Sequence, residues 1–176
     1  MAAAPIILPN KGRLPDIAAD AFIAPGAVVI GDVAIGAQSS VWFNCTVRGD
    51  VHEIRIGART NIQDGTVVHV TGGRFGTYIG SGITIGHGAI LHACTLEDDC
   101  FIGMGATVMD GVVVESGAMV AAGAVVTPGK RVRKGELWAG SPAKPMRDLR
   151  PDEVAFFAQS AANYVALAAQ YRAELG

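Results

Sequence analysis

An aliphatic residue returns at every sixth position along most of this chain of 176 residues. The members of the series are Ile23, Val29, Ile35, Val41, Val47, Ile56, Ile62, Val68, Ile79, Ile85, Leu91, Leu96, Ile102, Val108, Val114, Val120, Val126 and Val132. Insertions follow Val47 and Val68, and one residue is lost after Leu91. An amphipathic helix repeats about every 3.6 residues, so a period of six excludes a helical structure. The period predicts an all-β solenoid of hexapeptide repeats, a parallel β-helix in which three short strands form each coil.

The residue four positions after each aliphatic residue of the series is usually small, which suits a tight corner between two strands. Cys45 and Cys100 occupy this position, so we expect them to be packing residues rather than reactive thiols. The three cysteines are odd in number and form no Cys-x-x-Cys pair, so no disulfide framework and no thiolate zinc site is indicated. A reducing, cytoplasmic location is the default expectation.

The repeat accounts for residues 23–143. We expect residues 1–22 to form an ordered N-terminal arm and residues 144–176 a turn followed by a C-terminal α-helix, all within one domain. The helix is predicted after Pro151, because the following segment lacks glycine and proline and its apolar residues follow helical spacing. Those residues are Phe157, Ala161, Tyr164, Ala168, Tyr171 and Leu175.

The charge of the chain excludes several classes of partner. Its formal net charge is −2, which argues against binding to nucleic acid or another polyanion. No apolar run approaches the length of a membrane span, and no basic region precedes the short apolar patch near the N-terminus. We therefore expect neither nucleic acid nor a membrane as a partner.

Two histidines share a position in the repeat. His69 follows Val68 and His92 follows Leu91, and these aliphatic positions lie one coil apart. The two imidazoles should therefore lie on adjacent strands, about 4.8 Å apart along the solenoid axis. Two imidazoles at one strand spacing can share a zinc ion. Arg48 follows Val47 one coil earlier and belongs to the same column.

His87 occupies a different position. It lies two residues after Ile85, above Asp64 of the coil below, and across a corner from His92. A second copy of the chain could bring its His87 to the His69–His92 column, and a threefold ring would then contain three equivalent sites. Zinc is the default ion for neutral imidazoles, with iron, cobalt and nickel as open alternatives. Alternatively, the histidines are surface or interface residues without a ligand.

Several motifs resemble those of the γ-class carbonic anhydrases, in particular their bacterial hexapeptide-repeat branch. They are Arg-Gly-Asp at 48–50, Asn-Ile-Gln-Asp at 61–64, His69, and His-Gly-Ala-Ile-Leu-His at 87–92. The resemblance covers nearly the whole chain, and it implies a left-handed solenoid. It also implies a homotrimer with a zinc or iron site at each interface, with His69 and His92 from one subunit and His87 from the next.

The resemblance implies roles for further residues. Gln63 would position a metal-bound hydroxide or the substrate. Arg48 and Asp50 look like an ion pair that holds neighbouring subunits together, and Asp64 and Asn61 like partners that orient the ligands. The reaction implied is attack of the metal-bound hydroxide on CO₂ to give bicarbonate.

The chain departs from the best-studied members of that family where protons leave the site. Val51 stands directly after Asp50, where those members carry a glutamate, and the loop after Val70 contains no acid. His52 and Glu53 could substitute, so the rate of CO₂ hydration stays open. Tyr164 of the predicted helix is a further site candidate if the helix folds toward the interface.

Two other functions remain compatible with the sequence. A hexapeptide acyltransferase or acyl-CoA thioesterase would share the repeat, which is less specific than the histidine pattern. An acyltransferase needs a histidine base but not three histidines at metal-binding positions. A non-catalytic metal-binding trimer within a larger assembly is the third possibility.

Overall fold

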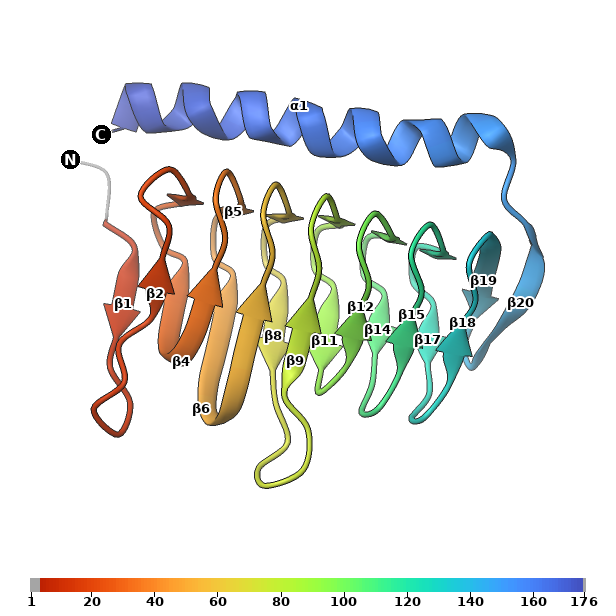
Figure 1. The fold of residues 1–176 in the computed structure, drawn as a ribbon, viewed down its shortest axis with the longest axis horizontal. Coiled ribbons are helices and arrows are strands. Elements are labelled where there is room, and N and C mark those ends of the chain that lie inside the picture. Colours follow the sequence, from red (N-terminus) through yellow and green to blue (C-terminus); the bar gives the residue numbers. More distant parts are fainter. Residues whose placement is uncertain (1–3, 176) are drawn as a thin grey trace.

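The computed structural model describes residues 4–175. Its body is a left-handed parallel β-helix, and one long helix runs along the outside of the stacked coils (Figure 1). Each coil contributes one strand to each of three faces. Neighbouring strands on a face come from successive coils, so residues about one coil apart in sequence become direct neighbours.

The first face lies under the helix, and we call it the helix face. Its strands are β3 (Phe22–Ile23), β5 (Ser40–Val41), β7 (Asn61–Ile62), β10 (Thr84–Ile85), β13 (Phe101–Ile102), β16 (Met119–Val120), β19 (Glu136–Gly140) and β20 (Ala143–Asp148). All pair in parallel except β20, which returns antiparallel to β19.

The second face carries two of the histidines, and we call it the histidine face. Its strands are β1 (Ile6–Leu8), the first parts of β4 (Val28–Ile35) and β6 (Thr46–Ile56), β8 (Val67–His69), β11 (Ile90–His92), β14 (Thr107–Val108) and β17 (Val125–Val126). The third face holds β2 (Asp16–Ile17), the last parts of β4 and β6, β9 (Thr77–Ile79), β12 (Thr95–Leu96), β15 (Val113–Val114) and β18 (Arg131–Val132).

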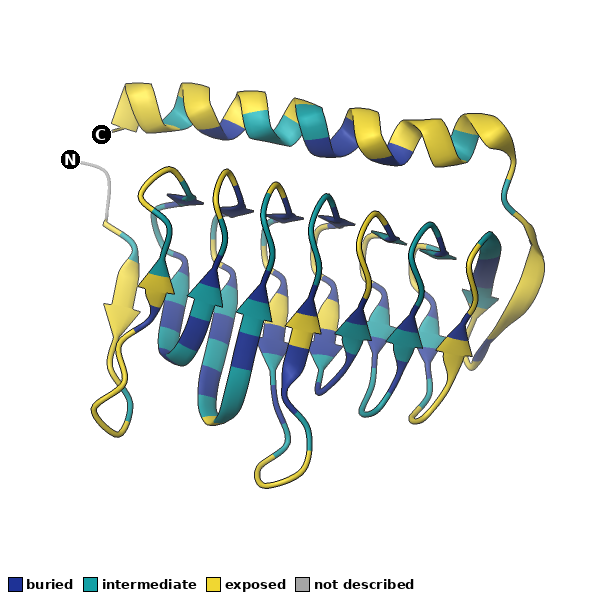
Figure 2. Ribbon diagram, viewed as in Figure 1, coloured by how far each residue is buried: buried dark blue, intermediate teal, exposed yellow. Residues whose placement is uncertain are grey.

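The repeat positions line the interior as predicted. Each column of aliphatic residues pairs in register, for example Val68 with Leu91 and Leu91 with Val108. All predicted inward positions are buried except Ile23, which is partly exposed in the first coil. Burial alternates along β4, as expected for a strand with one face on the core (Figure 2).

The cysteines are buried and unpaired, which confirms the packing role expected of Cys45 and Cys100. Burial raises the pKa of Cys45 to about 11 and that of Cys94 to about 12. Thiols with such pKa values stay protonated at neutral pH and are poor nucleophiles.

The C-terminal helix, α1 (Pro151–Leu175), lies along the helix face against β3, β5, β7 and β10. Phe157, Ala161 and Ala168 are buried as the spacing predicted, and Phe157 stacks on Phe101 with ring centroids 5.1 Å apart. Leu175, in the last turn of the helix, is exposed. Among residues 4–175, no helix has the length and hydrophobicity needed to cross a membrane.

Candidate metal centre

The two histidines that share a repeat position are direct neighbours. Strands β8 and β11 pair in parallel with His69 opposite His92, as the repeat predicted. The two rings face each other through single nitrogens, with 3.2 Å between Nδ1 of His69 and Nε2 of His92. Both side chains lie at the end of their strand, where the histidine face turns into the third face.

A carboxylate holds the outer nitrogen of each ring. Nε2 of His69 lies 2.9 Å from Oδ1 of Asp50, and Nδ1 of His92 lies 2.7 Å from Oδ1 of Asp110. Burial raises the pKa of both carboxyls, but hydrogen bonds outweigh it and leave both pKa values below the ordinary range. The donors are the side chains of His69 and Arg48 at Asp50, and those of Thr71 and His92 at Asp110.

The protonation of the carboxylates fixes that of the rings. An ionised carboxylate can only accept hydrogen bonds, so the outer nitrogen of each imidazole carries the proton. In a neutral imidazole the inner nitrogen then presents a lone pair. The inner nitrogens of two neutral rings thus point lone pairs at each other, an arrangement that a shared cation would stabilise.

A divalent metal ion fits between these nitrogens. Two zinc–nitrogen bonds of about 2.0–2.1 Å at a tetrahedral angle separate their nitrogens by about 3.3 Å. The separation in this chain is 3.2 Å. A carboxylate on the far nitrogen of a histidine ligand is also the usual arrangement in metalloproteins. Within residues 4–175, however, no three or more histidine, cysteine or acidic side chains converge on one point.

Arg48 contributes to this edge of the face through Asp50. Its guanidinium contacts Oδ2 of Asp50 within the same chain, while Oδ1 of that carboxylate accepts from His69. Asp50 therefore orients a histidine, a role that the sequence did not suggest for it. We call Asp50, His69, His92 and Asp110 the pair edge of the histidine face.

His87 lies at the opposite edge, where the chain enters the histidine face. Its Nδ1 is 2.7 Å from Oδ2 of Asp64, as expected from its place above that residue. Oδ1 of Asp64 accepts from the backbone N–H of Phe43 at 3.2 Å, and Gly88 takes the left-handed conformation (φ +67°) that the turn requires. The His87 side chain is about half exposed.

Asn61 and Gln63 belong to the same edge as His87. Both are buried, and Nε2 of Gln63 donates to Oδ1 of Asn61 at 3.1 Å. Asn61 in turn donates to Oγ1 of Thr84 at 2.9 Å, and Thr84 bonds to Ser160 of α1 at 2.9 Å. A continuous set of hydrogen bonds thus fixes the Gln63 amide against the helix.

Tyr164 lies close to this group but is mainly a packing residue. Its ring meets Trp42 edge to face at 5.4 Å. Burial, together with the negative charge of Asp64, raises the pKa of its hydroxyl.

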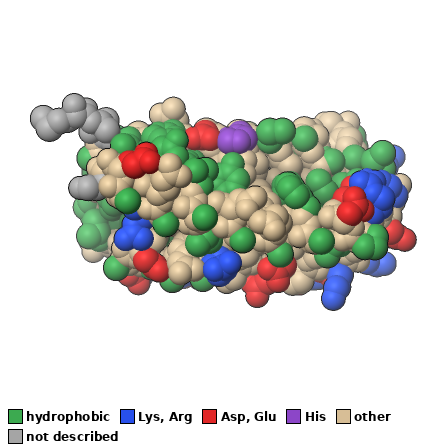
Figure 3. Space-filling model, turned by 90° about the horizontal axis from the view of Figure 1, so that it is seen from above, with side chains coloured by type: hydrophobic (Ala, Val, Ile, Leu, Met, Phe, Trp, Pro, Cys, Tyr) green, Lys and Arg blue, Asp and Glu red, His purple; other side chains and the backbone are tan. Residues whose placement is uncertain are grey.

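We call Asn61, Gln63, Asp64 and His87 the His87 edge. Seen from the helix side, the molecule presents histidine surface at one spot only, beside an acidic side chain on the rim (Figure 3).

The structure therefore divides the predicted site residues into two groups. The pair edge collects His69, His92, Asp50 and, through Asp50, Arg48. The His87 edge collects His87, Asp64, Gln63 and Asn61, with Tyr164 nearby. Each group is held together by its own hydrogen bonds.

Sequence reasoning missed Asp110 of the pair edge and its hydrogen-bond partner Thr71. Asp110 follows Val108 by two positions, and Val108 is the register partner of Leu91, so the repeat placed it one coil from His92. Thr71 lies at the start of the loop insertion and donates its hydroxyl to Asp110. The repeat could have indicated Asp110, but it does not extend into the insertion that holds Thr71.

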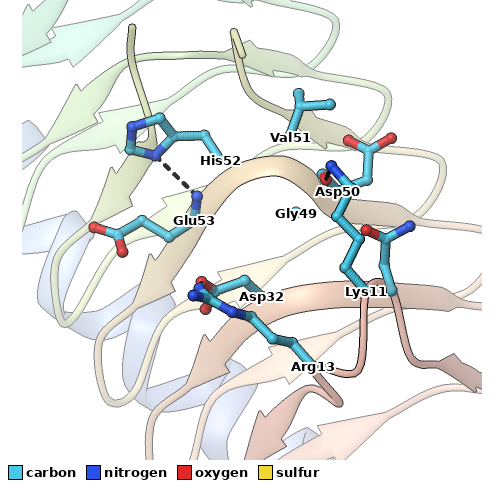
Figure 4. Close-up of a pocket in the computed structure, with 9 residues that line it drawn as sticks. Lys11, Arg13, Asp32, Gly49, Asp50, Val51, His52 and Glu53 are labelled. Atoms are coloured by element: carbon cyan, nitrogen blue, oxygen red, sulfur yellow. Dashed lines mark hydrogen bonds and ion pairs between the residues drawn. The ribbon is translucent and has the colours of Figure 1, made fainter. Parts of the chain in front are cut away.

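A cleft of about 450 Å³ adjoins the pair edge, between the turn at Asn10–Arg13 and the bend of β6 (Figure 4). Lys11 reaches across it to the backbone carbonyl of Asp50 at 3.5 Å. His52 and Glu53 also line this cleft. Nδ1 of His52 accepts from the N–H of Glu53 at 2.9 Å, and the Glu53 carboxylate receives the Tyr78 hydroxyl at 2.9 Å.

The chain resembles proteins of known sequence and structure. Residues 93–128 match the family model described as bacterial transferase hexapeptide (six repeats). The protein named "Gamma carbonic anhydrase 2, mitochondrial" of Arabidopsis thaliana is 52% identical over 167 residues, which cover 92% of this chain and 60% of the relative. The protein named "Carbonic anhydrase" of Geobacillus kaustophilus is 40% identical over 168 residues, which cover 96% of this chain and 92% of that protein.

A solved structure shares the fold of this chain. The crystal structure of a hexapeptide transferase family protein from Anaplasma phagocytophilum is 49% identical, with a TM-score of 0.91 over 94% of this chain and 98% of that one. The chain spans about 60% of the length of the plant relatives it matches. The bacterial relative, by contrast, is matched over nearly its whole length. The chain therefore belongs to the γ-class carbonic-anhydrase-like family of hexapeptide-repeat proteins.

Proposed function

We propose that this chain is a subunit of a homotrimeric γ-type carbonic anhydrase that hydrates CO₂ to bicarbonate at three intersubunit metal sites. The observation that carries the proposal is the pair of imidazole nitrogens 3.2 Å apart, each ring held from behind by a carboxylate. In this proposal, His69 and His92 hold the ion from one subunit and His87 from the next.

The surface between the two edges supports assembly through the histidine face. A mainly apolar row of side chains crosses the outside of this face. Its successive register partners are Ile6, Val28, Thr46, Val67 and Ile90. Ile6, Val67 and Ile90 are 47%, 40% and 44% exposed. An apolar row of this kind favours contact with another subunit. The pair edge and the His87 edge border this row, so a contact across it can join edges of two subunits.

The donor set favours zinc. Neutral imidazole nitrogens suit Zn²⁺, while Fe²⁺, Co²⁺ and nickel also bind such ligands. A bound divalent ion would supply the Lewis acidity that makes water a nucleophile at neutral pH, as zinc does in carbonic anhydrases. The unpaired buried cysteines agree with a reducing location, and we place the protein in the cytoplasm.

The other residues of the two edges then have distinct tasks. Asp50 and Asp110 keep the outer ring nitrogens protonated, so that the inner lone pairs stay available, and Arg48 holds Asp50 in place. Gln63 donates to Asn61, which leaves its amide oxygen free to accept a hydrogen bond from water or from the hydroxyl of bicarbonate. Asp64 orients His87, with Tyr164 packed beside it.

Protons leave the site toward the cleft next to Asp50. His52 lines this cleft, and the N–H of Glu53 occupies its Nδ1. The neutral ring therefore carries its proton on Nε2, and His52 could accept a second proton only after Nδ1 releases the Glu53 N–H. Glu53 is engaged by Tyr78 and by Arg55, and is therefore the weaker candidate.

Mixing two inactive variants tests the proposed division of ligands. His69→Ala and His87→Ala each remove a ligand, but from opposite edges. Random trimers of an equal mixture contain one intact site in each mixed trimer, so about a quarter of the wild-type metal content and CO₂ hydration should return. Metal analysis and stopped-flow hydration assays of the co-refolded proteins measure this recovery.

A second mixture is the matched control. His69→Ala and His92→Ala remove ligands from the same edge, so no mixed trimer contains an intact site and no recovery is expected. Sedimentation must show that all variants form trimers. Recovery in the control mixture, or none in the test mixture, refutes the division of ligands between subunits.

The relatives named as transferases favour one alternative, an acyl-CoA-directed enzyme. The family model over residues 93–128 and the solved Anaplasma relative both carry that description. Release of free thiol from acyl-CoA, with and without an amine acceptor, separates an acyltransferase or thioesterase from the proposed lyase. Metal bound at the site without turnover of CO₂ or acyl-CoA would instead indicate a non-catalytic trimer.

A further inference from the structure

The loop that interrupts the repeat contacts a residue of the pair edge. Residues 71–76 form an excursion between β8 and β9, and Thr71 at its base donates its hydroxyl to Oδ2 of Asp110. The other oxygen of that carboxylate accepts from Nδ1 of His92 at 2.7 Å. A loop residue is thus connected to a histidine of the next coil through one carboxylate.

The two ends of this connection are rigidly held. Thr71 accepts a backbone hydrogen bond from Phe75 at 3.2 Å and donates one to the Phe75 carbonyl at 3.0 Å, which closes the loop at its base. The backbone carbonyl of Asp110 accepts from Gly129 at 2.9 Å, so its coil is fixed to the next coil. The Asp110 carboxylate is therefore positioned by contacts from two sides.

The two carboxylates of the pair edge are held in different ways. Asp50 is held by the cation of Arg48 two residues away on the same strand. Asp110 lacks an arginine or lysine partner among the ion pairs of residues 4–175, and its second oxygen depends on the Thr71 hydroxyl. The orientation of His92, unlike that of His69, therefore depends on the loop.

We infer that Asp110, held by Thr71, is a positioning residue that sets the orientation and donor strength of His92, so that the loop insertion tunes metal affinity. The inference rests on the proposed metal site. Groups that hold the far nitrogen of a histidine ligand typically change metal affinity by about 10–100-fold when they are mutated. Asp110→Asn keeps an acceptor for His92 but removes the charge. Thr71→Val keeps the shape of the side chain but removes the hydroxyl.

Two measurements test the inference. The matched controls are Asp99→Asn and Thr95→Val, whose side chains take no part in the hydrogen bonds of the pair edge. Zinc affinity, from competition with a chromophoric chelator, should fall about 10–100-fold in Asp110→Asn and by a smaller factor in Thr71→Val, with the controls unchanged. Since Thr71 acts through Asp110, adding Thr71→Val to Asp110→Ala should cause no further loss. Equal affinity in Asp110→Asn and Asp99→Asn overturns the inference while leaving the proposed function intact.

The second measurement uses metal-free protein. Nitrogen-15 chemical shifts of the imidazoles should show His92 protonated at Nδ1 in the wild type, with this preference lost in Asp110→Ala. Wild-type protein that binds none of zinc, iron, cobalt and nickel refutes the proposed function, and the shifts still report whether Asp110 orients His92. A wild-type His92 protonated at Nε2 overturns the inference.

Discussion

Thr77 joins the backbones of the two strands that carry the paired histidines. It is fully buried, and its hydroxyl donates to the carbonyl of His69 at 2.5 Å and accepts from the N–H of Ala93 at 3.0 Å. Thr77→Val preserves the shape of the side chain and removes both hydrogen bonds. Each is worth about 0.5–1.5 kcal/mol, so the free energy of unfolding should fall by about 1–3 kcal/mol.

Thr77→Ser provides the matched comparison. It keeps the hydroxyl and loses one buried methyl group, which costs about 1 kcal/mol. Urea unfolding at one fixed protomer concentration measures both variants, because the stability of an oligomer depends on concentration. The backbone N–H of Ala93 also reaches the His69 carbonyl at 3.1 Å, so the loss should stay within the stated range. A valine variant as stable as the wild type, or more stable than the serine variant, would refute the assigned role of the hydroxyl.

Three further outcomes follow from the packing and the ion pairs. Leu91→Ala, in the fully buried column of the histidine face, should lower the unfolding free energy by about 2–5 kcal/mol in the same urea assay. Gly36→Ala should yield little folded protein by circular dichroism, because a Cβ would lie 2.6 Å from the backbone carbon of Gly57 in the next coil. The side-chain hydrogen bond from Arg147 lowers the pKa of Glu153 from 4.5 to about 2. The ionised Glu153 therefore stabilises the fold above pH about 4.5, this contribution is lost as the pH falls toward about 2, and Glu153→Gln should flatten that part of the pH–stability curve.

The sequence predicted the parts of the fold that depend on the repeat. A period of six specifies which side chains point inward, and parallel stacking specifies which residues become neighbours. The opposition of His69 and His92 followed from these two facts alone. Burial of the aliphatic columns was equally predictable, because each coil can cover its apolar surface only with the next coil.

The features that the sequence did not reveal lie where the repeat is interrupted. The insertion after Val47 becomes the bend of β6, which places Asp50 behind His69. The insertion after Val70 brings Thr71 to Asp110. The path of an irregular segment depends on contacts distant in sequence, which a local pattern does not contain. Which nitrogen of each imidazole faces its neighbour could likewise be read only from the carboxylates around the pair.

The antiparallel return of β20 determines where the stack of coils ends. A parallel strand edge can pair with another molecule, and a solenoid with open ends can polymerise into fibres. Here β20 covers the edge of β19 with reversed polarity, and it carries Lys144, Pro145 and Arg147 on an exposed surface. Proline offers no N–H, and the charges disfavour an apolar neighbour. The β19 edge is thus closed to parallel pairing with another molecule, and a chain lacking residues 143–148 would be expected to associate through that edge.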